Sequence, residues 1–300
     1  GGAIVAVKDY AQTFQTNNCT IARNSSNIEG AAANVTLDGK AESVTFVYVD
    51  STKGWVLVSE STSVYGPAFV SASGGTITTC GNFKIHTFTG QGTFTVCSAG
   101  NPAGSDTVEY VVVAGGGSGG GKISNSSGGG GGGAGGFRFA SPSLAPLTYP
   151  AKPLAAPAGL PVSAQGYPIT VGGGAPASPS SPFDSPGNSG SNSVFSTITS
   201  AGGGAGAGGG QAGQGSAGGS GGGQSLSPNH PCGTVYAGNT PPVSPPQGNP
   251  GGAAAPPGNH ASGGGGAIAA GTATPGSTGG NGGAGAGVPT AFGSNGESCG

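Results

Sequence analysis

The sequence predicts an all-β protein with essentially no α-helix, ending in a long glycine-rich region. Two observations carry this prediction. Short stretches of alternating β-branched and aromatic residues, separated by turn residues, recur through residues 1–113, a pattern typical of a small β-sandwich or barrel. Most of the 69 glycines lie in residues 114–300, far above the roughly 7% glycine of ordinary proteins.

Composition divides the chain into three predicted segments, 1–64, 65–113 and 114–300. Only 6% of the residues are charged and the formal net charge is −2, so we expect no binding to nucleic acid. No apolar run approaches the about 18 residues of a membrane span, so we expect no membrane insertion. Because the chain has no methionine and Ile4–Val7 has the character of a strand already in progress, we expect the distal part of a longer protein.

The first segment, residues 1–64, is predicted to be a small β module. In Ser43–Val49, Val44, Phe46 and Tyr48 alternate with the residues of the opposite face, as in a half-buried strand. The turn at 52–54 then leads into a returning strand at 55–58, which completes a hairpin. The stretches 19–23 and 34–37 predict two further short strands.

The second segment, residues 65–113, is predicted to contain strands at 75–79, 83–88, 93–96 and 108–113. The turn at 90–92 predicts that 83–88 and 93–96 are neighbouring strands. His86 lies in one of them without a histidine at metal-ligand spacing, so we expect a packed or surface histidine. The last strand runs directly into the first glycine run, 115–117.

The glycine runs permit three interpretations. Collagen requires glycine at every third position without a break, and the runs here are separated by loops of other residues, so collagen is excluded. A flexible linker is the second, but aromatic residues recur through the loops. The third is a bundle of polyglycine II helices, whose outward-pointing backbone groups pair between neighbouring helices.

Two parts of the chain resemble known proteins. Between Lys8 and Val58, the pieces Arg23-Asn24, Ile28-Glu29-Gly30 and Lys53-Gly54-Trp55 occur in order. They resemble a small β module repeated among tail fibers of marine bacteriophages. The strand 108–113, with the glycines after it, resembles the start of the glycine-rich domain of phage tail fibers and adhesins. The Pro/Ala-rich residues 141–165 and the last residues, 288–300, depart from that pattern.

This resemblance implies a polyglycine II bundle with irregular loops for residues 114–300. It also implies the distal, receptor-binding part of a tail fiber, located on the virion and acting in host adsorption. Fibers of this type are usually homotrimers, joined to other fiber proteins through a preceding part of the chain. The partner on the host would be a cell-surface glycan or an outer-membrane protein.

We expect receptor contacts in the loops, because loops on a rigid scaffold usually carry binding residues. The longest predicted loops are 137–171, 176–200, 225–250 and 288–300. The candidate residues are Tyr149, Tyr167, Phe183, Phe195, Tyr236, Asn239 and Phe292. For each aromatic ring, the alternative interpretation is packing onto the bundle or onto a neighbouring chain.

Catalytic chemistry is not predicted. Asp184 and Glu297 are the only carboxylates of the glycine-rich region, too few for a glycosidase acid and base. No zinc, P-loop or EF-hand pattern occurs, so we expect no enzyme, cofactor or metal. The five cysteines show no CxxC spacing, which leaves buried packing or a disulfide between Cys80 and Cys97. The alternative functions are an extracellular structural or cell-wall protein and an enzymatic tailspike.

Overall fold

The computed structural model describes residues 2–60, 68–101, 104–121, 128–141, 154–178, 185–209, 214–225, 235–254, 260–273, 278–287 and 292. The chain divides into two compact units, Gly1–Ala68 with Asn101–Gly104, and Phe69–Gly100 with Ser105–Gly300. The fold is all-β, as predicted, and the described residues contain no α-helix. Three segments were expected. Instead, residues 69–100 and 105–113 belong to the same unit as the glycine-rich region.

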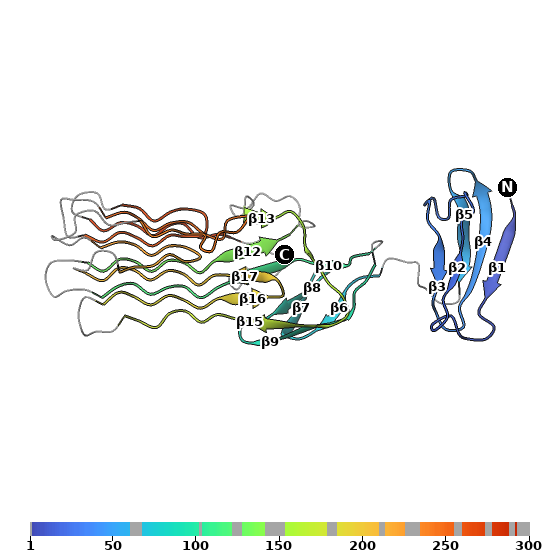
Figure 1. Ribbon diagram of the computed structural model, residues 1–300, viewed down its shortest axis with the longest axis horizontal. Coiled ribbons are helices and arrows are strands. Elements are labelled where there is room, and N and C mark those ends of the chain that lie inside the picture. Colours follow the sequence, from blue (N-terminus) through green and yellow to red (C-terminus); the bar gives the residue numbers. More distant parts are fainter. Residues whose placement is uncertain are drawn as a thin grey trace. The chain divides into compact units, whose positions relative to one another are not determined.

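The first unit is a small two-sheet module (Figure 1). One sheet has the order β1-β4-β5 and the other pairs β2 with β3, and neighbouring strands in both are antiparallel. The strands are β1 (Ile4–Lys8), β2 (Cys19–Ile21), β3 (Val35–Leu37), β4 (Ser43–Asp50) and β5 (Gly54–Glu60). The predicted hairpin and both additional short strands are therefore confirmed.

Side chains from both sheets build the core of the first unit. Leu37 and Val44 are completely buried, and Ile28 and Phe46 are nearly so. Trp55 packs against this cluster and meets Tyr48 edge-to-face, with ring centroids 5.5 Å apart. The predicted alternation in Ser43–Val49 is confirmed, and the face that carries Val44 and Phe46 points into the core.

The second unit contains four small sheets, and the glycine runs extend from them (Figure 1). The largest sheet has the order β17-β16-β15-β9-β6, beside β11-β12-β13, β10-β14 and β7-β8. The strands are β6 (Ser71–Ser73), β7 (Thr76–Cys80), β8 (Phe83–Thr87), β9 (Gly92–Ser98), β10 (Thr107–Val108), β11 (Tyr110–Val113), β12 (Phe137–Ala140), β13 (Ala155–Ala156), β14 (Leu160–Pro161), β15 (Gly166–Thr170), β16 (Ser193–Phe195) and β17 (Ile198–Ser200).

Two sequence-based expectations about these strands are corrected. The turn at 90–92 does not join paired strands, because β8 pairs with β7 whereas β9 pairs with β6 and β15. The expected loops 137–171 and 176–200 contain strands β12 to β17. Their side chains complete a core with β9 and β11, in which Phe94, Tyr110 and Phe195 are buried together. This shared core explains why the segment 69–113 and the glycine-rich region form one unit.

The glycine runs extend side by side from the strands (Figure 1), and their backbones are joined by hydrogen bonds with a three-residue repeat. Every third residue of run 128–136 donates to the same neighbouring run. The pairs are Gly130–Ala207 (2.7 Å), Gly133–Gly204 (2.8 Å) and Gly136–Ala201 (2.7 Å). The residues one position further along, Gly131 and Ala134, donate instead to Ser262 and Gly265 of another run. Three residues per turn, with backbone hydrogen bonds between neighbouring runs and none within a run, is polyglycine II geometry.

Run 201–209 lies at the centre of the bundle and is buried along its whole length. It exchanges backbone hydrogen bonds with the runs 115–121, 130–136, 187–190 and 216–223. Gly203, Gly206 and Gly209 donate to one neighbour, and Gly204 and Ala207 donate to another. A buried segment thus has its backbone polar groups satisfied by several neighbours at once, which buried backbone requires.

Glycine is required in the bundle by the closeness of neighbouring backbones. A Cβ added at Gly206 would overlap the carbonyl oxygen of Gly130, and one at Gly222 would overlap that of Ala205. The left-handed glycine φ values, in contrast, all occur at or before Gly100 among the described residues. Residues on the outside differ, because nothing lies within 4 Å of a Cβ built at Gly173.

Candidate functional site

The chain leaves and re-enters the described runs at one end of the bundle. There, the Gly121 N–H donates to the Ser185 carbonyl (2.8 Å) and the Gly209 N–H donates to the Gly121 carbonyl (2.8 Å). The Ser225 hydroxyl donates to the Gly128 carbonyl over 2.8 Å. We call this the loop end, defined by the run ends Gly121, Gly128, Ser185, Gly209 and Ser225. The ends of these runs are therefore held beside one another by hydrogen bonds.

Gln224 and Ser262 brace the loop end from inside. Both are buried, and the Gln224 N–H donates to the Ser262 hydroxyl over 2.7 Å. The Gln224 side-chain carbonyl accepts the Ala254 N–H at 2.7 Å. These side chains bond the ends of separate runs to each other where the three-residue backbone pattern stops.

The proline-rich segment 239–247 is held in one shape by two amides. The Asn239 side-chain carbonyl accepts the N–H groups of Val243 (3.1 Å) and Gln247 (3.2 Å). Gln247 is fully buried, donates its side-chain N–H to the Pro241 carbonyl (2.9 Å) and accepts the Ala201 N–H (2.8 Å). Asn239 therefore organises this segment internally, because its side-chain carbonyl and its side-chain NH₂ group are both bonded within the segment.

Two of the predicted receptor-binding residues are core residues instead. Tyr167 and Phe195 are 7% and 8% exposed and pack on Phe94, with ring centroids 6.5 and 5.8 Å from it. Hydrogen bonds from the side chains of Gln165 and Ser163 and from the Ser163 N–H lower the pKa of Tyr167. The prediction of receptor contact was wrong for both rings, because strands β15 and β16 turn them inward.

The other candidates are placed less deeply. Tyr236 is half-buried, and its hydroxyl accepts the Gly215 N–H over 2.9 Å, so its ring packs along the bundle. Phe292 is also half-buried. Tyr149 and Phe183 lie outside the described residues. The structure does not bring the described candidates together into one site.

The predicted disulfide between Cys80 and Cys97 is wrong. Cys97 is a free, exposed cysteine, whereas Cys80 is bonded in a disulfide. Cys80 ends β7 of the two-stranded sheet, and Cys97 lies in β9 of the five-stranded sheet. The two residues are close in sequence but belong to different sheets, which the presumed hairpin between β8 and β9 obscured.

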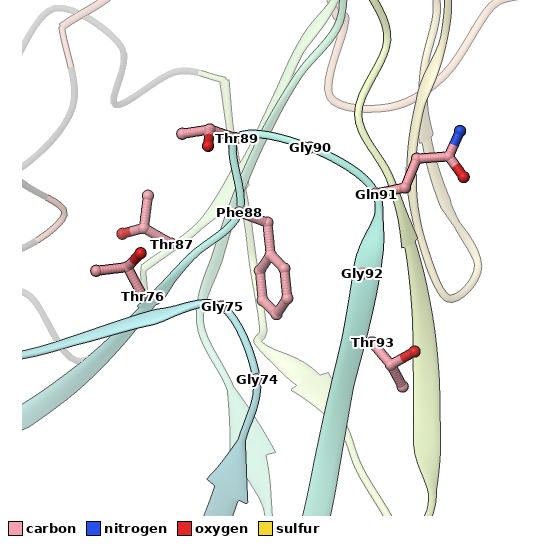
Figure 2. A pocket seen from close by; sticks show the side chains of 10 residues that line it. All are labelled: Gly74, Gly75, Thr76, Thr87, Phe88, Thr89, Gly90, Gln91, Gly92 and Thr93. Carbon is pink, nitrogen blue, oxygen red and sulfur yellow. The ribbon is translucent and has the colours of Figure 1, made fainter.

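A groove of about 350 Å³ lies between the end of the β7–β8 hairpin and the start of β9. Figure 2 shows the Phe88 ring between the backbone of Gly74-Gly75 and that of Gly92. Cβ atoms added at Gly75 or Gly92 would approach the ring to 3.1 Å. We call this space the Phe88 groove, lined by Gly74, Gly75, Thr76, Thr87, Phe88, Thr89, Gly90, Gln91, Gly92 and Thr93.

The groove combines one aromatic ring with hydroxyl, amide and backbone groups. Thr76, Thr87 and Thr89 lie on one side of the ring, and Gln91 and Thr93 lie on the other (Figure 2). Its ten lining residues include no charged side chain. Sequence reasoning missed this groove, because β9 was expected to pair with β8. The available signal was the run of threonines and glycines around Phe88.

The described part of the chain offers neither a cluster of metal ligands nor a membrane-spanning helix. No group of three or more His, Cys, Asp or Glu side chains there could hold a metal ion. Nor does any helix among those residues have the length and apolar character needed to cross a membrane.

The fold and the loop end define a class of protein: an all-β chain whose glycine-rich region is a packed bundle of hydrogen-bonded runs that end together on one side. Comparison with known families agrees with this class. The model of the glycine-rich domain family matches residues 87–300, so the chain belongs to that family. Comparison with curated proteins gives no match.

Proposed function

We propose that this chain is the distal, receptor-binding part of a bacteriophage tail fiber and acts in host adsorption on the virion. One observation carries the proposal: the described runs end together at Gly121, Gly128, Ser185, Gly209 and Ser225, on a bundle held by backbone hydrogen bonds. A scaffold of this kind tolerates changes in the connecting sequence while keeping its position fixed, as receptor recognition requires. The resemblance of residues 8–58 to fiber modules adds support.

The proposal includes partners. The chain would assemble as a homotrimer, connect through a preceding part to other fiber proteins, and bind a host glycan or outer-membrane protein. Light scattering on the whole chain tests the trimer, for which a mass of three chains is expected. A monodisperse monomer at micromolar concentration would contradict the trimer without affecting the receptor role.

Competition for adsorption tests the receptor role. The whole chain should be used, because residues 69–113 share a core with the glycine-rich region. Added in excess, it should reduce the adsorption of a phage whose fiber contains this sequence. A matched variant replaces the connecting residues 122–127 and 179–184 by glycine–serine segments of equal length, and should lose competition at unchanged melting temperature. Folded wild-type chain that fails to compete would refute the proposal.

Two alternatives remain to be separated from it. A cell-wall or matrix protein would bind isolated cell walls but not compete with phage. An enzymatic tailspike would release reducing ends from host polysaccharide, and we expect none. The irregular sequence between the runs favours recognition over a purely structural role, because repeats that only build a scaffold have no need to differ.

A further inference from the structure

The Phe88 groove lies among the strands of the second unit, at the opposite end of the runs from the loop end (Figure 1). It is open to solvent, and its lining is described throughout. Neither the glycine scaffold nor the loop end uses it. A volume of about 350 Å³ is within the range of small-ligand sites, roughly 300–1,000 Å³.

The chemistry of the lining restricts the ligand. Phe88 offers a ring face, whose negative electrostatic potential attracts the polarised C–H groups of a sugar ring. Threonine hydroxyls can both donate and accept hydrogen bonds, and the Gln91 amide supplies one acceptor and two donors. This combination matches a polyhydroxylated, partly apolar ring.

The absence of charge from the ten lining residues decides between ligand classes. A nucleotide also stacks on an aromatic ring, but phosphate recognition relies on arginine, lysine or helix N-termini. Acidic sugars carry a carboxylate that would lack a cationic partner in this groove. A fully apolar ligand would leave the hydroxyl and amide groups without hydrogen-bond partners, which costs affinity.

The groove continues into the outer face of the five-stranded sheet. Thr93 and Thr95 of β9 are exposed on that face, since the intervening Phe94 points into the core. Thr95 is flanked in register by Ser73 of β6 and Gly166 of β15, and Ser73 is exposed as well. Hydroxyl groups therefore extend the groove along the start of β9.

We propose that the Phe88 groove and the hydroxyl groups of Thr93 and Thr95 bind a neutral polysaccharide. One sugar ring packs on Phe88, and the following units bond to the threonines. This site is separate from the loop end and does not depend on its proposed receptor role. A receptor-binding protein and a structural protein can both hold such a polymer. Because the groove is open, we expect a dissociation constant on the order of 1 mM for a short oligosaccharide.

NMR titration of the whole chain tests the proposal. The neutral probes are maltoheptaose, laminarihexaose and mannohexaose, and oligogalacturonate is the acidic comparison. We expect at least one neutral oligosaccharide to shift the amide signals of Gly90, Gly92 and Thr93, and the acidic one to leave them unchanged. The proposal would be overturned if no neutral oligosaccharide shifted these signals at a concentration about ten times the expected dissociation constant. Equal binding of the acidic oligosaccharide would overturn the ligand class.

Two variants locate the binding. Phe88→Leu removes the ring face while keeping apolar bulk against the core. Gly90→Leu adds a bulky side chain to the lining, at a position where nothing lies within 4 Å of a Cβ. Each should weaken binding about tenfold or more. Thr78→Val, on exposed β7 outside the lining, is the control and should bind as wild type. Unchanged affinity in Gly90→Leu would overturn the assignment even if Phe88→Leu fails to fold.

The adsorption assay keeps the two proposals apart. A chain that binds a neutral oligosaccharide at the groove but does not compete with phage would support the groove and refute the receptor role. Competition without any shift at Gly90 or Gly92 would refute the groove alone.

Discussion

The first unit and the glycine bundle bury their backbones in different ways. In the first unit, sheets satisfy the backbone and side chains such as Leu37, Val44 and Phe46 fill the space between them. In the bundle, the central run 201–209 is buried, and all of its residues are glycine or alanine. The space that side chains occupy in one region is occupied by neighbouring backbones in the other. The two regions should therefore respond in opposite ways to the same change in side-chain volume.

The energetic terms differ accordingly. Burial of apolar side chains contributes about 25 cal/mol per Å² in the first unit. Glycine contributes no side chain and loses about 1–2 kcal/mol of backbone entropy per residue. Hydrogen bonds with a net value of about 1 kcal/mol must offset most of that loss, assisted by Cα–H···O contacts between closely spaced runs. Every run must therefore keep its spacing, which makes the bundle sensitive to single added methyl groups.

The largest expected effect comes from Gly206→Ala. The new methyl group would overlap the carbonyl oxygen of Gly130, which is fixed by its own hydrogen bond from Gly120. We expect a loss of more than about 4 kcal/mol, enough to unfold the second unit. Thermal unfolding followed by circular dichroism measures it. Gly173→Ala, where a Cβ meets nothing within 4 Å, is the matched control and should stay within about 0.5 kcal/mol; equal effects would refute the account of the glycines.

The converse change is Leu37→Ala in the first unit. Leu37 is completely buried, and removing its side chain should cost about 3 kcal/mol through lost burial and the remaining cavity. Fluorescence of Trp55, the single tryptophan, reports this transition because Trp55 packs on the same core. Val58→Ala, which is 58% exposed in wild type, serves as control. A shift in the unfolding of the glycine bundle as well would show that the two units are not independently stabilised.

The sequence predicted the first unit well because its strands are adjacent and regularly alternating. The pairs β2–β3 and β4–β5 connect neighbouring segments, so short-range patterns are sufficient. The glycine scaffold was also predicted, but the composition only permitted it, and the family resemblance implied it. Pairings over long separations were missed, as with β9 and β15, where Phe94 faces Tyr167.

The candidate site was predicted less well for a related physical reason. An aromatic ring between proline and glycine residues is equally compatible with a surface loop and with a short inward-facing strand. Tyr167 and Phe195 are of the second kind, and only the long-range pairing of β15 with β9 and β16 reveals it. The Phe88 groove was missed because its far wall is the start of β9, which pairs with β6 and β15 and not with β8.

A smaller effect is expected at the polar contacts that fix the edge of the bundle. Gln247→Leu removes the partner of the Ala201 N–H and of the Pro241 carbonyl, while approximately keeping the buried volume. Leaving a buried donor without a partner costs about 1–3 kcal/mol, so we expect a loss of about 2 kcal/mol in the unfolding of the second unit. Gln91→Leu, at an exposed position, is the control. Equal stability of both variants would show that Gln247 only fills space.

The smallest expected effect is a difference between the two regions in how their stability changes with pH. Burial raises the pKa of Asp9, but hydrogen bonds from the N–H groups of Thr13, Phe14, Ala41 and Gln12 outweigh it and leave this pKa below its usual value. An unfolded Asp titrates near about 3.9, so this carboxylate stabilises the first unit above about pH 4. The stabilisation is lost as the pH falls through the lower, folded-state pKa. Urea unfolding followed by Trp55 fluorescence between about pH 2 and pH 7 should show the loss in wild type.

Asp9→Asn should remove that part of the pH dependence, whereas Asp38→Asn, at an exposed position, should keep it. The glycine-rich region has few carboxylates, so its unfolding should change less over the same range, and an equal acid response in both units would contradict this difference.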